Sequence, residues 1–136
     1  MRIVINALQY KQNSSGIGML IRELFGRYAA MTTHACQVVL SKDSPDFPLG
    51  RNAEQLRQPW NYGDKLRRIL FQSVRLGPKY CKNAVLLTTD SKIPLFLPKS
   101  CRVFPVITDL AVYRMPEVYQ ASRVILWRLQ YRYLCR

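Results

Sequence analysis

Four short runs along the chain combine β-branched and other apolar residues in the way typical of buried strands in a parallel sheet. They cover residues 2–6, 37–41, 84–89 and 102–108. Pro105 falls inside the last run. Because proline cannot donate to a strand ladder, it indicates an edge position or a bulge there.

A second pattern places apolar side chains at helical spacing after the first run. They recur three and four residues apart, as one face of a helix requires, at Ile17, Leu20, Ile21, Leu24, Phe25 and Tyr28. Ser14 or Ser15 could cap this helix. The opening of the chain therefore predicts a strand, a helix and a second strand.

Two further helices are predicted later in the chain. Asp64 could cap one that ends at Gly77–Pro78 and packs a core stripe of Leu66, Ile69, Leu70 and Val74. Pro116, with Glu117 beside it, begins another that runs toward Arg136 without a stop signal. Residues 42–63 are rich in proline, glycine and polar residues, so they predict a long loop, with one helical turn as an alternative.

Strands that alternate with helices predict an α/β fold, a Rossmann-like open parallel sheet with flanking helices. The length of 136 residues and the 49% of hydrophobic residues suit one domain with its own core. The pattern stops within a helix, after four strands. We therefore expect residues 1–136 to form a single, incomplete domain.

Other features of the sequence restrict the class of protein. We find no run of about 18 apolar residues and no signal-peptide pattern, so we expect a cytoplasmic protein. The four cysteines are widely separated and His34 is the only histidine, which disfavours a zinc site and indicates reduced thiols. We expect His34 to be a boundary residue, not a general base.

Charge divides the chain unevenly. The formal net charge is +13, and residues 65–136 carry 14 basic and 3 acidic side chains. Such a field attracts nucleic acid, anionic membranes or phosphorylated ligands alike. The simpler alternative is a solubilising surface whose acidic counterpart lies on another domain or partner.

The basic residues gather in two clusters. One comprises Lys65, Arg67, Arg68, Arg75, Lys79 and Lys82, and the other Arg123, Arg128, Arg132 and Arg136. Arg128, Arg132 and Arg136 are four residues apart and share a helix face, beside Trp127 and Tyr131. This face could contact an anionic membrane or another anion. Alternatively, the two aromatic residues pack under the domain while the arginines are solvated.

The turn Ser15-Gly16-Ile17-Gly18 is the first candidate for binding chemistry. It would lie at a helix N-terminus near the carboxyl ends of the strands, where free N–H groups suit a phosphate. Alternatively, Gly16 only supplies a positive φ before an ordinary helix. An NAD-binding motif has Gly-x-Gly-x-x-Gly directly after a strand, whereas here the glycines begin about ten residues later and Ile21 replaces the third glycine, which disfavours NAD binding. A Walker loop is excluded because no Gly-Lys-Ser/Thr occurs.

The second candidate is Thr108-Asp109, directly after the fourth strand run. An aspartate at the carboxyl end of a strand would face the same crevice as the glycine turn. A helix cap or a loop hydrogen bond is the more common role for such an aspartate.

Two stretches, "SSGIGMLIRELFGRY" and "VFPVITDLAVYRMPE", together resemble the N-terminal half of a family 4 (group 1) glycosyltransferase of the GT-B fold. The resemblance implies transfer of a hexose from a nucleotide sugar, which serves as co-substrate. The acceptor would be a glycan, a lipid-linked sugar or another component of the cell envelope, and neither a cofactor nor a metal would be needed. It implies that Ser15, Gly16, Ile17 and Gly18 lie against the donor diphosphate, and that Thr108 and Asp109 border the site of transfer. It also implies a role in polysaccharide biosynthesis. The protein would be cytoplasmic, either free or attached peripherally to the inner face of the membrane.

The sequence departs from that family in two respects. Thr108 stands where the family has histidine, and threonine cannot supply the chemistry of an imidazole. The family's second domain, which holds most of the donor site, has no counterpart in residues 1–136, so we expect this chain alone to be inactive. Such a domain could lie on another chain.

Two other functions remain open. The chain could be a non-catalytic remnant whose basic half docks on a membrane or a partner. Nucleic-acid binding rests on charge alone, since no RRM, KH or helix-turn-helix signature occurs.

Overall fold

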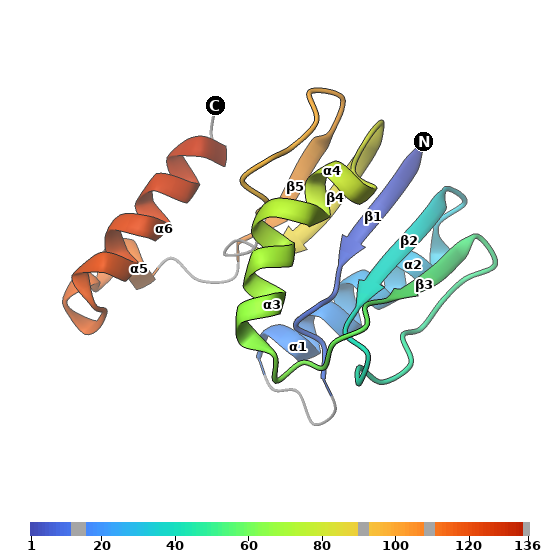
Figure 1. The fold of residues 1–136 in the computed structure, drawn as a ribbon, viewed down its shortest axis with the longest axis horizontal. Coiled ribbons are helices and arrows are strands. Elements are labelled where there is room, and N and C mark those ends of the chain that lie inside the picture. Colours follow the sequence, from blue (N-terminus) through green and yellow to red (C-terminus); the bar gives the residue numbers. More distant parts are fainter. Residues whose placement is uncertain (12–15, 90–92, 108–110, 135–136) are drawn as a thin grey trace.

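The computed structural model describes residues 1–11, 16–89, 93–107 and 111–134, and its centre is a wholly parallel five-stranded sheet (Figure 1). The order across the sheet is β3-β2-β1-β4-β5. This confirms the predicted Rossmann-like α/β fold. The strands are β1 (Arg2–Asn6), β2 (Ala35–Leu40), β3 (Ala53–Arg57), β4 (Ala84–Thr89) and β5 (Arg102–Val106).

Helical segments cover both faces of the sheet (Figure 1). One face carries α1 (Ile17–Leu20), the π-helical turn η1 (Ile21–Phe25) and α2 (Gly26–Met31), which follow one another without a break. The other face carries α3 (Lys65–Leu70), the π-helical turn η2 (Phe71–Arg75) and α4 (Leu76–Tyr80). Each set forms the connection between two strands of the sheet.

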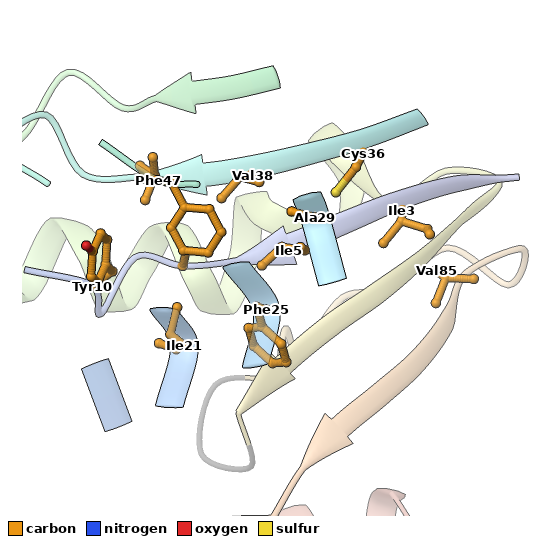
Figure 2. Close-up of a cluster of buried hydrophobic side chains, with 12 residues drawn as sticks. Ile3, Ile5, Tyr10, Ile21, Phe25, Ala29, Cys36, Val38, Phe47 and Val85 are labelled. Atoms are coloured by element: carbon orange, nitrogen blue, oxygen red, sulfur yellow. The ribbon is translucent and has the colours of Figure 1, made fainter. Parts of the chain in front are cut away.

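The side chains of β1 alternate between two core clusters. Ile3 and Ile5 lie in one cluster together with Ile21 and Phe25 of η1 (Figure 2). Val4 lies in the second cluster, which also contains Phe71, Leu76, Val39, Leu86, Leu8, Cys81 and Ala84. A strand with both faces buried needs this nearly continuous apolar sequence, so β1 is the middle of the domain.

The edge strand β3 corrects the prediction of a long loop over residues 42–63. It pairs with β2 through residues 53–57, and its sequence, AEQLR, is mostly polar. A strand that pairs on one side only does not need an apolar sequence, and therefore gives little signal. β5 lies at the opposite edge, which confirms the position that Pro105 indicated.

The second predicted helix is present, but two details were wrong. It continues past Gly77 and Pro78 to Tyr80 without a break in the helical run. The predicted core stripe faces solvent: Leu66, Ile69, Leu70 and Val74 are all exposed. The face that packs on the sheet carries Phe71, Gln72 and Leu76 instead.

The last helices stand apart from the sheet (Figure 1). They are α5 (Ala111–Arg114), the 3-10 turn η3 (Pro116–Val118) and α6 (Ala121–Leu134). Pro116 does open a helical turn, but the extended backbone of Tyr119 separates it from α6. Val124 is buried against Tyr119 and Trp127 in a small cluster of its own.

Candidate functional site at the carboxyl edge of the sheet

The carboxyl end of β1 is the point where the connections between strands diverge. β1 lies between β2 and β4, so the chain builds the sheet first to one side of β1 and then to the other. In open α/β sheets, ligands bind in the crevice outside such a point. The segments that leave β1 and β4 there define the candidate site.

A buried polar cluster closes the floor of this edge. The Asn6 amide Nδ2 donates to Thr88 Oγ1 over 3.1 Å, and Gln72 Nε2 donates to Asn6 Oδ1 over 3.4 Å. All three residues are buried. Since buried polar groups are costly without partners, these bonds hold the ends of β1 and β4 and the helix turn η2 together.

Sequence reasoning did not identify this cluster as part of the site. Asn6 is separated from Thr88 by 82 residues and from Gln72 by 66. The available signal was a polar residue at the end of an apolar strand, as at Asn6 and at Thr88.

The loop after β1 is fixed by two serines from the segment that follows β2. Ser41 Oγ donates to the Leu8 carbonyl over 3.3 Å, and Ser44 Oγ donates to the Tyr10 carbonyl over 2.8 Å. Leu8 is fully buried. The backbone that leads from β1 toward the glycine turn therefore has a defined path up to Lys11.

Gly16 begins the helical segment that follows this loop. Its φ is 57° and its ψ is −114°, a combination that residues with a Cβ rarely adopt. The Gly16 carbonyl accepts from Leu20 N over 3.0 Å, and no side chain caps the helix at Gly16. The first N–H groups of a helix lack partners within the helix, so those of this first turn need acceptors from outside it.

The structure brings three predicted site residues to this edge. Gly16 is exposed, Ile17 is half-buried and Gly18 is buried. Ser15, Thr108 and Asp109 lie outside the described residues, as does Ser14, the other possible cap.

Two cations meet over one aromatic ring beside the same edge, which sequence reasoning missed. The Arg68 guanidinium lies 4.2 Å and the Lys11 ammonium 5.2 Å from the centre of the Tyr62 ring. Arg68 Nη1 also donates to the Tyr62 carbonyl over 2.9 Å. Cations over a ring face are attracted by its quadrupole. The loop after β1 and the first turn of α3 therefore share a positive surface suited to an anionic ligand.

The predicted cationic face of α6 lies away from this crevice. Arg128 and Arg132 are exposed, with Ile125 and Leu129 exposed beside them, and Arg136 lies outside the described residues. The Arg128 guanidinium lies 5.7 Å from the centre of the Tyr113 ring. Trp127 packs against Tyr119 with ring centres 5.6 Å apart, within the small cluster of the last helices. The side chain of Tyr131 lies outside the description, so the packing alternative stays a prediction.

The perturbed thiols lie at the opposite, amino edge of the sheet. Cys81 precedes β4 and Cys101 precedes β5, and both are free. A hydrogen bond from Cys81 lowers the pKa of the Cys101 thiol, and the same bond, with burial, raises the pKa of Cys81. Burial alone raises the pKa of Cys36 to about 11. None of these three thiols belongs to the carboxyl edge.

Among the described residues, no group of three or more histidine, cysteine, aspartate or glutamate side chains is placed to hold a metal ion. The helices in the described ranges are all too short or too polar to cross a membrane. Comparison with protein-family models, with curated proteins and with solved structures finds no match to this chain.

Proposed function

We propose that this chain is the acceptor-side domain of a nucleotide-sugar-dependent glycosyltransferase of the GT-B type. The observation that supports it best is the position of the Gly16 turn, which opens the helical segment that follows β1, the strand where the connections diverge. That position suits the diphosphate of a nucleotide sugar. The sequence resemblance adds the class of reaction.

In the proposed reaction, the bond between the anomeric carbon and the donor diphosphate breaks, and the nucleoside diphosphate leaves. An acceptor hydroxyl gives its proton to an oxygen of the departing diphosphate and forms the new glycosidic bond at that carbon. The N–H groups of residues 16–18 face the departing diphosphate, and the positive surface of Lys11 and Arg68 stabilises its charge. Asp109 orients the acceptor, with Thr108 beside it.

The assignment predicts weak binding of nucleotide sugars by this chain alone. UDP-glucose and GDP-mannose, titrated into the ¹⁵N-labelled chain, should shift the amide resonances of Gly16, Ile17 and Gly18, with dissociation constants of about 1 mM or weaker. The amide of Met31, at the exposed end of α2 that precedes β2, is the internal control.

Two outcomes would contradict the proposal. One is that the resonances of residues 16–18 stay unchanged at the highest soluble concentration of the sugar nucleotides. The other is an equal response to inorganic phosphate and to the nucleotide sugars, which would make the turn an unspecific anion site.

Added to a separate donor-binding domain, the chain should support turnover that neither part shows alone.

A further inference from the structure

The outer face of the helical run α3–η2 is an unexpected apolar surface. Leu66, Ile69, Leu70 and Val74 are spaced three or four residues apart and are 71%, 52%, 54% and 43% exposed. They form one stripe, and it points away from the sheet because Phe71 and Gln72 occupy the opposite side of the helix. Contiguous exposed apolar side chains mark interaction sites more often than a solvated surface.

The segment that precedes β5 extends this surface. Leu95 N donates to the Ser73 carbonyl over 2.8 Å, which ties the segment to η2. The Phe96 carbonyl lies so close to Gly77 that an added Cβ there would be 1.9 Å from its oxygen. Leu97 packs inward on the core, whereas Leu95 and Phe96 are 65% and 59% exposed.

Cations flank the apolar stripe: Arg67 and Arg75 line one groove together with Leu70 and Val74. Residues 65–107 contain nine lysines and arginines and one acidic residue, Asp90. Lys65, Arg67, Arg75, Lys79 and Lys99 are exposed. The ion pairs among the described residues all lie elsewhere, on Arg22, Arg27 and Arg57, so the cations of this stretch are not neutralised by carboxylates of the described chain.

We propose that this surface, formed by α3, η2 and residues 95–96, docks on an anionic lipid bilayer. The helix would lie in the plane of the interface, with Leu66, Ile69, Leu70, Val74, Leu95 and Phe96 among the upper acyl chains. The flanking cations would contact anionic headgroups. Helices with one apolar and one cationic side bind membranes in this way.

The combination of groups favours this occupant over a nucleic acid or a second copy of the chain. A nucleic acid would meet the cations but would leave the aliphatic stripe against phosphates. A second copy of this chain would bring a rim of the same charge against this one, at +13 for each chain. An anionic bilayer satisfies both the apolar centre and the cationic rim. This surface is distinct from the cationic face of α6, and its assignment does not depend on the proposed sugar transfer.

The test is flotation of the full chain with vesicles. We expect binding to an equal mixture of phosphatidylcholine and phosphatidylglycerol, little binding to phosphatidylcholine alone, and weaker binding when NaCl rises from about 0.1 M to about 0.5 M. Leu66→Gln with Phe96→Gln should weaken binding about tenfold or more. Met31→Gln, at an 82% exposed position on α2, should not.

A second pair of variants separates the two cationic surfaces. Lys65→Gln with Arg67→Gln should weaken binding roughly tenfold or more, whereas Arg128→Gln with Arg132→Gln on α6 should leave it unchanged. Circular dichroism of each variant checks that the fold persists. Absence of flotation by the unaltered chain would overturn the proposal, as would dependence on α6 alone or equal binding by the Leu66/Phe96 variant.

Discussion

At the scale of single residues, the two sides of the candidate site differ in how much the sequence could reveal. The Gly16 turn is a local feature: glycines next to serines and an apolar helical repeat predict a helix start, and φ at Gly16 is indeed positive. The cluster of Asn6, Thr88 and Gln72 depends on the pairing of β1 with β4. No spacing along the sequence encodes that pairing.

The backbone of Gly16 leads to a prediction about stability. Gly16→Ala should lower the free energy of unfolding by about 1–3 kcal/mol, because φ of 57° with ψ of −114° strains a residue with a Cβ. Gly63→Ala is the matched control: an added Cβ meets nothing within 4 Å at either glycine, but Gly63 has no positive φ. Urea denaturation compares the two. Equal midpoints would show that the conformation of Gly16 is not as described.

The thiol pair at the amino edge gives a prediction about reactivity. Because the thiolate is the nucleophile and the hydrogen bond from Cys81 lowers the pKa of Cys101, iodoacetamide should modify Cys101 first. Cys36, with a pKa of about 11, and Cys81 should react slowly near neutral pH. Peptide mapping by mass spectrometry in a Cys135→Ser background measures the order. Similar rates at all three, as expected in guanidinium, would contradict it.

At the scale of elements, the pattern of apolar residues predicted where helices occur better than which way they face. The first helix buries Ile21 and Phe25 of its predicted stripe, yet Leu24 and Tyr28 of the same stripe are exposed. In α3–η2 the whole stripe is exposed. Both runs contain a π-helical turn, which adds a residue to the turn and rotates the rest of the helix. A repeat counted at 3.6 residues does not anticipate that rotation for the residues after the turn. Leu66, Ile69 and Leu70 precede η2, and they are exposed because Phe71 and Leu76 face the sheet instead.

The orientation of α3–η2 can be tested by truncating two side chains that are two residues apart and face opposite ways. Phe71→Ala should cost about 3–5 kcal/mol of unfolding free energy, since Phe71 is 5% exposed and its ring lies 4.8 Å from that of Trp60. Ile69→Ala, on the exposed side, should cost about 1 kcal/mol or less. Thermal or urea unfolding measures both. The reverse order would mean that the predicted stripe, and not Phe71, faces the sheet.

At the scale of the whole molecule, the structure has a second exposed apolar surface besides that of α3–η2. A groove of about 490 Å³ lies between η1–α2 and the strands β4 and β5. Its lining is almost wholly apolar and consists of Met1, Leu24, Phe25, Tyr28, Val85, Leu87, Arg102, Phe104 and Val106. It lies on the face of the sheet opposite α3, so the domain has two separate exposed apolar surfaces.

This groove should cause the chain to self-associate at high concentration. Leu24 and Phe104 are 48% and 57% exposed, and covering them removes apolar area from water at about 25 cal/mol per Å². The net charge of +13 opposes contact between copies. Salt screens that repulsion, so sedimentation should show association that rises with protein concentration and with NaCl. This is the opposite of the salt response expected for binding to anionic vesicles.

Two variants assign the association to the groove. Leu24→Lys with Phe104→Lys should restore the monomer at every salt concentration, because the new cation in each wall of the groove repels the facing copy. Met31→Lys adds the same kind of charge to α2 outside the groove and should have a smaller effect, while Leu66→Gln with Phe96→Gln tests the surface on the other face. If association survives the Leu24/Phe104 change but disappears with the Leu66/Phe96 change, the copies associate through the surface on α3 and not through the groove. A monomer under all conditions would show that charge repulsion exceeds the gain from burying either surface.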